Sequence, residues 1–234
     1  MARVDGKVVF ISGGARGQGA SHAELLARHG AAVVIGDIRH EEAEATAARL
    51  RAADLAVTAV ELDVTSAGSW RRAVAATEEL HGRLDLLVNN AGIARGGGLM
   101  EQTEEEWASV LAVNQTGPFL GMQAAVPSMR RSGRGGSIIN VSSTLGIQAS
   151  PSAISYHATK AAVRMLTRAA AVTLVADGIR VNCLVIGMVD TPFLDPVKQA
   201  GGFEQRIASY PMGRAATPTE ISYGVLYLAS DESS

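Results

Sequence analysis

Cysteine is almost missing from this chain of 234 residues, which contains only Cys183. A single cysteine excludes an internal disulfide and any metal site built from several thiolates. Disulfides are characteristic of oxidising compartments, so this usage predicts a cytoplasmic protein. The sequence therefore gives no reason to expect a metal ion.

Charge of one sign is not in excess either, because 21 basic and 23 acidic residues leave a formal net charge of −2. This balance gives no electrostatic reason to expect nucleic acid or an anionic membrane as partner. Long apolar runs are also missing, and the stretch before Lys7 lacks the apolar core of a signal peptide. We therefore expect a small-molecule ligand, with no nucleic-acid or membrane partner.

Apolar residues are plentiful, at 47 % of the chain, and residues 1–234 fit one domain with a substantial core. Short β-branched runs alternate with longer segments of helical periodicity, which predicts an α/β fold: a doubly wound parallel sheet. The expected strands are Val8–Ile11, Ala32–Ile35, Val57–Leu62, Leu84–Val88, Ser137–Val141 and Arg180–Val185. The expected helices are Gly19–His29, Glu41–Arg51, Ala67–His81, Glu104–Met129, Tyr156–Val175 and Thr219–Leu228.

One irregular stretch, residues 187–211, is long for a connection inside a compact domain. Such segments are often lids or binding loops. We therefore expect a substrate lid at about 187–211.

A glycine-rich turn, Ser12–Gly19, follows the first expected strand and opens the first helix. Glycines permit the tight turn and the approach of a pyrophosphate, and the helix N-terminus favours the phosphates. This context predicts a dinucleotide site, with Gly13, Arg16, Gln18 and Gly19 as candidate residues. In isolation the same pattern also fits a plain structural turn.

Asp37 ends the second strand, where an acidic side chain accepts hydrogen bonds from the adenosine ribose. A carboxylate there repels a 2′-phosphate, which favours NAD over NADP. Arg16 and Arg39 act in the other direction, because either guanidinium could pair with that phosphate. We expect the carboxylate to dominate, although a solvated strand end is the alternative interpretation of Asp37.

Two further strand ends carry polar side chains at the edge where ligands bind in open α/β sheets. Asp63 and Val64 follow the third strand, and Asn90 lies in the Asn-Asn-Ala-Gly segment after the fourth. Asp63 could instead cap the following helix, a role that Thr65 or Ser66 would also serve. The asparagine pair could equally form a structural turn.

Tyr156 and Lys160 lie four residues apart, on one face of an expected helix. A free phenol titrates near pH ~10, and a nearby cation lowers that pKa. The pair is then suited to exchange a proton with an alcohol or a carbonyl. Ser143, thirteen residues before Tyr156, can hydrogen-bond the same substrate oxygen. On its own this spacing is also typical of an ordinary surface pair.

Together these segments resemble the short-chain dehydrogenase/reductase family in order and spacing. The matching segments are Ser12–Gly19, Asp63-Val64, Asn89–Gly92, Asn114, Ser143, Tyr156-x-x-x-Lys160 and Arg180–Asn182. The resemblance covers nearly the whole chain. It implies a Rossmann-like fold, a nicotinamide cofactor and a homotetramer.

The resemblance also implies roles for single residues. Tyr156 would be the general acid/base, and Ser143, rather than Ser142, would orient the substrate carbonyl. Lys160 would lower the Tyr156 pKa and bind the nicotinamide ribose, while Asn114 would hold a water on the proton path. The adenosine would be held by Asp37, Asp63 and Val64, the ribose region by Asn90, and the nicotinamide carboxamide by Val189 and Thr191.

The chain departs from the family pattern at three places. Ser12 replaces a threonine and keeps the hydroxyl, whereas Ile186 replaces a proline before the lid, which predicts a looser loop there. The family's final strand does not follow Ser234, so we expect the sheet to lack it. Either the sequence is incomplete or the assembly differs from the usual tetramer, and we favour an incomplete sequence.

The expected pocket walls are largely apolar, which suits a hydrophobic alcohol or ketone. They comprise residues 94–99 and 145–151, including Gln148, with Met188, Phe193, Leu194, Phe203, Tyr210 and Met212 from the lid. The glycine turn and Asp37 segment look most like bacterial 3α/20β-hydroxysteroid dehydrogenases, which implies a hydroxysteroid or a similar secondary alcohol. The alternatives are an NADPH-dependent 3-oxoacyl carrier-protein or other ketone reductase, and a non-catalytic NAD-binding regulator.

Overall fold

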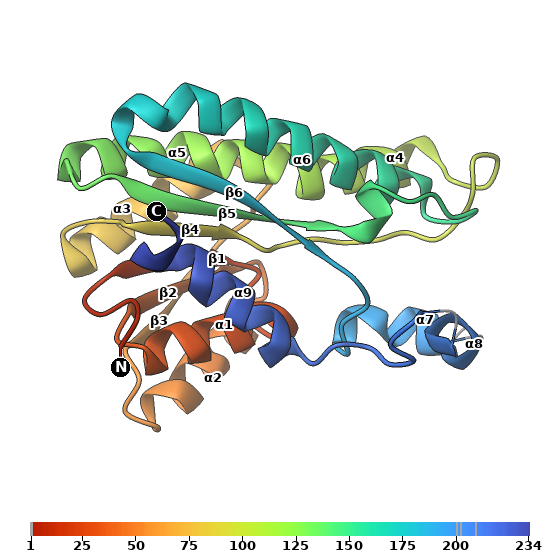
Figure 1. The fold of residues 1–234 in the computed structure, drawn as a ribbon, viewed down its shortest axis with the longest axis horizontal. Helices are drawn as coiled ribbons and strands as arrows, with labels where there is room; N and C mark the ends of the chain where they lie inside the picture. Colours follow the sequence, from red (N-terminus) through yellow and green to blue (C-terminus); the bar gives the residue numbers. More distant parts are fainter. Residues whose placement is uncertain (1, 200, 202, 209) are drawn as a thin grey trace.

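A parallel sheet of six strands organises the part of the chain that the computed structural model describes, residues 2–199, 201, 203–208 and 210–234. The strand order is β3-β2-β1-β4-β5-β6, with helices on both faces (Figure 1). The strands are β1 (Val8–Ser12), β2 (Ala32–Asp37), β3 (Val57–Glu61), β4 (Leu86–Asn89), β5 (Gly136–Ser143) and β6 (Ile179–Ile186). The predicted doubly wound α/β fold is confirmed.

Helices cover both faces because each central strand is apolar on both sides. Alternate residues of β1 show this: Val9 and Ile11 pack on one helical layer and Phe10 on the other. The first layer contains α1 (Gly17–Arg28), α2 (His40–Arg51) and α9 (Pro218–Ala229); the second contains α3 (Ala67–His81), α5 (Gly117–Ser132) and α6 (Ile154–Leu174). Within the described residues, no helix is long and apolar enough to cross a membrane.

Two expected segments differ from the structure. The single helix predicted over Glu104–Met129 is interrupted: α4 (Glu104–Leu111) and α5 are joined by a π-helical turn at Ala112–Thr116. The stretch 187–211 is not irregular throughout, because it contains a short 3₁₀ turn (Pro192–Leu194), α7 (Asp195–Gln199) and α8 (Phe203–Ala208). Short amphipathic turns of this length give too weak a periodicity to be recognised.

Chain direction in the sheet determines where a ligand can bind. The connections run outward from β1 to β2 and β3, and then from β4 to β5 and β6 on the other side. In such sheets the helices leave a crevice at the carboxyl ends of the strands where the order reverses. The ends of β1, β4 and β5 lie at that edge, and so do the residues predicted to be functional.

Candidate active site

The glycine turn after β1 approaches the chain segment that follows β4 very closely. Gly13 has φ +69°, and a Cβ there would lie 2.8 Å from Ala91 Cα, so only glycine fits. A Cβ at Gly19 would clash with the Gly13 carbonyl. The Asn90 side chain donates hydrogen bonds to the carbonyls of Ser12 (3.0 Å) and Gly13 (3.1 Å). Asn90 therefore shapes this turn, a contact that the sequence does not predict.

The start of α1 is suited to the phosphates of a dinucleotide. Its N-cap residue, Arg16, is exposed and provides no side-chain hydrogen bond to the first turn, where there is also no acidic residue. The first backbone N–H groups of α1 can therefore serve an anion. Gln18 is half-buried, and its Oε1 is a buried acceptor with no hydrogen-bond partner among the described residues. A buried amide oxygen without a partner in the described part of the chain, beside an uncapped helix start, fits a polar cofactor.

Asp37 is fixed in place by the backbone. Its Oδ2 accepts from the Ala15 amide at 3.1 Å, and its Oδ1 accepts from the Arg39 amide at 3.0 Å. Each oxygen keeps a lone pair for a further donor. The Arg39 guanidinium lies 3.9 Å from the Glu42 carboxylate, so this arginine already has an acidic neighbour. The carboxylate thus stands ready for hydroxyl donors beside the glycine turn.

Asp63 and Val64 follow β3 at the same edge. The Asp63 Oδ1 accepts hydrogen bonds from Thr65, from the amide at 2.9 Å and from the hydroxyl at 2.7 Å. The N-cap of α3 is Ser66, whose hydroxyl accepts from the Ser69 amide. Helix capping is thus assigned to Ser66, which leaves Asp63 available for another role.

The two serines at the end of β5 have different partners. Ser142 is fully buried, and its hydroxyl donates to the Lys160 carbonyl at 2.8 Å. Ser143 Oγ accepts from the Leu145 amide at 3.1 Å, which leaves its hydroxyl proton free to donate. This arrangement favours Ser143 over Ser142 as the residue that binds a substrate oxygen.

Tyr156 and Lys160 are brought together by α6 as the spacing predicts. Lys160 Nζ lies 5.4 Å from the centroid of the Tyr156 ring and donates to the Val141 carbonyl at 2.8 Å. Burial raises the pKa of Tyr156 to about 12, while the neighbouring Ser143 side chain acts in the opposite sense. The predicted lowering of this pKa by Lys160 is therefore wrong for the side chains of the chain itself, because desolvation dominates. Burial also lowers the pKa of Lys160 to about 8.

Asn114 lies on the π-helical turn between α4 and α5 and is fully buried. Its side chain forms a pair of 2.8 Å hydrogen bonds with the backbone of Ile93, accepting from the amide and donating to the carbonyl. A Cβ at Gly92 would lie 3.4 Å from Asn114 Oδ1 and 3.7 Å from Lys160 Nζ. Asn114 therefore lies beside the lysine, on a type of helical irregularity that is frequent at functional sites.

The start of the lid closes the site from the β6 side. Ile186, expected to loosen this region, is a buried residue of β6 that pairs with Ser143, so regular strand continues to the residue before Gly187. Val189 forms a parallel bridge with Ala216, which ties the two ends of the lid together. Thr191 is buried against the glycine turn, with its Cβ 3.4 Å from the position a Cβ would take at Gly17.

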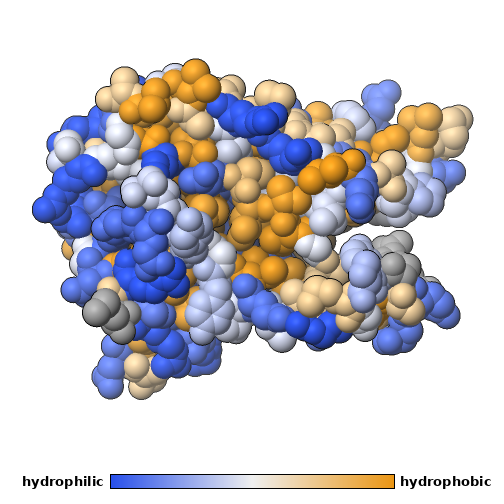
Figure 2. Space-filling model, viewed as in Figure 1, coloured by the Kyte–Doolittle hydropathy of each residue, from blue (hydrophilic) through white to orange (hydrophobic). Residues whose placement is uncertain are grey.

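Exposed apolar side chains occur in and next to the segments predicted to wall the substrate pocket. The Phe193 ring from the lid lies 6.0 Å from the Tyr156 ring. Figure 2 shows a hollow between the loop end of the upper layer and the projecting lid. Exposed apolar residues of the surrounding segments are Leu99, Met100, Ile147, Phe193 and Met212.

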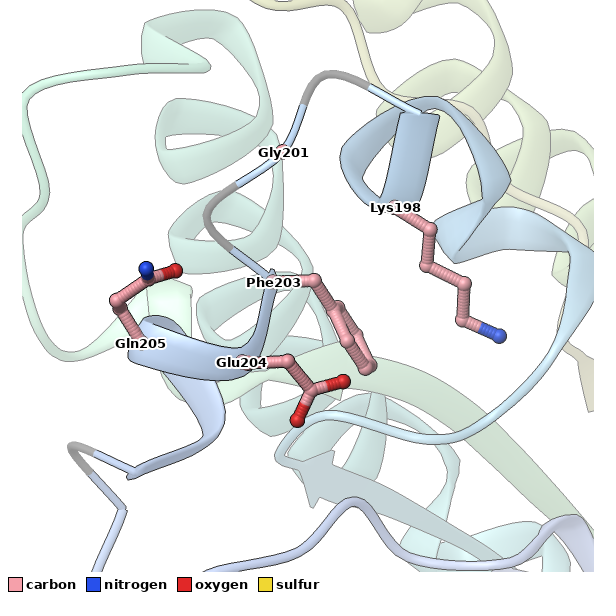
Figure 3. A pocket seen from close by; sticks show the side chains of 5 residues that line it. All are labelled: Lys198, Gly201, Phe203, Glu204 and Gln205. Carbon is pink, nitrogen blue, oxygen red and sulfur yellow. The ribbon is translucent and has the colours of Figure 1, made fainter.

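A separate cavity of about 490 Å³ lies within the lid, between α7 and α8. Figure 3 shows its lining, with the Phe203 ring on the side facing Lys198. Lys198 Nζ lies 5.5 Å from the centroid of that ring. The lining includes none of the predicted catalytic or cofactor residues, so the convergence of Ser143, Tyr156 and Lys160 defines the site.

Comparison with known proteins shows extensive similarity. The family model described as Enoyl-(Acyl carrier protein) reductase matches residues 13–234. The 2,5-dichloro-2,5-cyclohexadiene-1,4-diol dehydrogenase LinX of Sphingobium indicum is 46 % identical over 98 % of this chain and 91 % of its own length. The 3-alpha-(or 20-beta)-hydroxysteroid dehydrogenase of Mycobacterium tuberculosis is 47 % identical over 99 % of this chain and 85 % of its own.

A solved structure adds the cofactor class. The gluconate 5-dehydrogenase of Burkholderia cenocepacia, in complex with NADP and tartrate, has a TM-score of 0.93 and 34 % identity over 99 % of this chain and 91 % of its own. The glycine turn, the uncapped start of α1 and the orphaned Gln18 amide fit such a dinucleotide. This chain is an oxidoreductase with a nicotinamide dinucleotide site, and it belongs to the short-chain dehydrogenase/reductase family.

Proposed function

We propose that this protein is an NAD-dependent dehydrogenase that interconverts a ring-bearing, apolar secondary alcohol and its ketone. The observation that carries the proposal is the convergence of Ser143, Tyr156 and Lys160 at the carboxyl edge of the sheet, beside the glycine turn. Both similar dehydrogenases are named for ring-bearing alcohols. The exposed apolar side chains of the predicted pocket walls, among them Leu99, Ile147 and Phe193, suit such a substrate.

In this proposal two donors converge on one substrate oxygen. Ser143, with a lone pair engaged by the Leu145 amide, directs its hydroxyl proton at that oxygen. Tyr156 exchanges a proton with the same oxygen, and its raised pKa keeps the phenol protonated, the form that donates in the ketone-reducing direction. Donors aimed at an oxygen that gains negative charge stabilise the transition state more than the ground state. When bound, the nicotinamide ring supplies or accepts the hydride.

Lys160 and Asn114 support the tyrosine. One N–H of Lys160 is used by the Val141 carbonyl, which leaves two donors for the nicotinamide ribose and a water. The side-chain amide of Asn114 donates to the Ile93 carbonyl and to Thr159 Oγ1, and its oxygen accepts from the Ile93 amide. Among the described residues, one lone pair of that oxygen therefore remains for the water. Val189 and Thr191 would contact the carboxamide from the lid side.

The preference for NAD rests on Asp37, whose carboxylate is held at the end of β2 by two amides. A 2′-phosphate would meet this charge at close range, and Arg39 has Glu42 as a competing partner. The structural neighbour that contains NADP favours a second candidate, an NADPH-dependent ketone reductase. A homotetramer and a cytoplasmic location stay predictions.

A direct test measures formation of reduced nicotinamide from cyclic secondary alcohols, hydroxysteroids and linear secondary alcohols, with NAD and NADP in parallel. We expect turnover of cyclic alcohols with NAD. The matched control is Tyr156→Phe, which should lower kcat by at least about 100-fold while leaving NADH binding unchanged. Full activity of this variant would disprove the mechanism. Faster turnover with NADP than with NAD would support the second candidate, the NADPH-dependent reductase. NADH binding without any turnover would support a non-catalytic regulator.

A further inference from the structure

The helix that carries Tyr156 begins without a cap of its own. Its N-cap residue, Ala153, has left-handed backbone angles (φ 59°, ψ 47°) and no polar side chain to satisfy the first turn. The Ser155 amide instead donates to Gln102 Oε1 at 3.0 Å. Gln102 comes from the loop before α4, just after the predicted wall segment 94–99, so this loop caps the helix that carries Tyr156.

His157 links the second predicted wall, residues 145–151, to the start of α6. Its Nε2 lies 3.0 Å from the Ser150 amide nitrogen, and because an amide only donates, this ring nitrogen is the acceptor. The proton of the neutral ring therefore resides on Nδ1, which lies 2.8 Å from the Ala153 carbonyl and donates to it. The half-buried imidazole thus spans from the first turn of α6 to the loop that follows β5.

The first wall is also joined directly to the start of α6. The Ala153 amide donates to the Gly97 carbonyl at 2.7 Å. Three hydrogen bonds, at Ser155, Ala153 and Ser150, therefore tie both loops to the residues next to Tyr156. Leu99 and Ile147, which expose apolar side chains, lie on these two loops.

We propose that Gln102 and His157 are positioning residues that set the distance between the two substrate walls over Tyr156. The proposal builds on the function proposed above. Neither residue is placed to exchange a proton with the substrate: both side chains are occupied by backbone groups. Their loss should weaken substrate binding and leave the hydride step largely unchanged.

The test uses two variants of His157 that divide its hydrogen bonds. His157→Gln places an amide oxygen where Nε2 lies and so keeps the acceptor for Ser150. His157→Asn places an amide nitrogen where Nδ1 lies, which keeps the donor to Ala153 and loses the acceptor. Ser150→Ala is the control, since it removes the two 3.2 Å contacts of Oγ, with His157 Nε2 and with the Ser152 carbonyl, and retains the amide donor.

Two readouts are needed, and the first is independent of turnover. Amide hydrogen exchange at Ser150 should accelerate by about fivefold, the effect of one hydrogen bond, in His157→Asn but not in His157→Gln or Ser150→Ala. The KM for a cyclic alcohol should rise by a similar factor in His157→Asn, with kcat and the KM for NAD unchanged. Gln102→Ala should act in the same way, with faster exchange at Ser155.

The outcomes distinguish a failure of this positioning role from a failure of the proposed dehydrogenase function. If the wild type turns over no alcohol, the proposed function fails, and the exchange rates still decide whether the residues hold the walls. If the wild type is active, equal exchange and equal KM in the Asn and Gln variants of His157 overturn the proposal. A fall in kcat without a change in KM overturns it as well, and should His157→Asn fail to fold, Gln102→Ala decides by the same criteria.

Discussion

We expect the buried His22 to destabilise the fold in mild acid, and its contribution can be measured separately from that of the other titrating groups. Its ring is fully buried, with Nδ1 2.7 Å from Ser222 Oγ of α9 and no partner for Nε2 among the described residues. Burial lowers its pKa from the ordinary 6.5 to about 3. The folded protein therefore keeps the ring neutral at pH values where the unfolded chain binds a proton.

The sign and the size of the change in unfolding free energy with pH follow from this difference in pKa. Above the ordinary pKa both states are neutral and His22 contributes no pH dependence. Below it only the unfolded state gains a proton, so stability falls by about 1.4 kcal/mol for each pH unit until the folded pKa is reached. Between about pH 7 and about pH 4.5 the loss is about 2.5 kcal/mol, a large share of the ~5–15 kcal/mol that stabilises a typical domain.

Urea unfolding of the wild type and of His22→Leu at these two pH values isolates the contribution. Leucine fills a similar volume and does not titrate, and the remaining groups titrate alike in both proteins. The wild type should lose about 2.5 kcal/mol more than the variant between the two pH values. Any pH-independent cost of the lost Ser222 contact cancels in this comparison. Equal losses in the two proteins would refute the reasoning, because the ring would then titrate in the folded state as it does in the unfolded chain.

Three further changes test the cofactor site and the start of α6. Asp37→Ser should raise the kcat/KM ratio of NADP to NAD by at least about tenfold, since it removes a carboxylate that would face the 2′-phosphate; an unchanged ratio would contradict this role. Gly13→Ala should lower thermal stability and weaken NADH binding in a fluorescence titration, because a Cβ at φ +69° would contact Ala91. Ala153→Gly should raise the free energy of unfolding by up to about 1 kcal/mol, since glycine adopts left-handed angles without strain; a clear loss in urea unfolding would argue against strain at this position.

The sheet was predictable because buried parallel strands appear as continuous apolar runs, which β1, β2 and β4 show most clearly. The π-helical turn at Asn114 was not predictable, because its local sequence pattern continues the helical periodicity of the segments on both sides. It is accompanied by a contact distant in sequence, the paired hydrogen bonds between the Asn114 side chain and Ile93. The structural use of Asn90, Gln102 and His157 was missed for the same reason, since each binds backbone from another segment or loop.

Tyr156 and Lys160 show that sequence spacing predicts which side chains are neighbours more reliably than it predicts how their pKa values shift. Four residues on a helix guarantee neighbouring side chains, and the 5.4 Å separation agrees. The sign of the pKa shift depends instead on how much water each group loses, which the packing of the lid, β5 and α6 decides together. Here desolvation opposes the charged form of both residues, so it raises the pKa of Tyr156 and lowers that of Lys160. Both residues are thereby biased toward neutrality, and a neutral phenol beside the Ser143 hydroxyl is a donor pair. With Tyr156 as the proposed acid, the raised pKa keeps its phenol protonated at neutral pH, which is the form that can give a proton to a ketone oxygen.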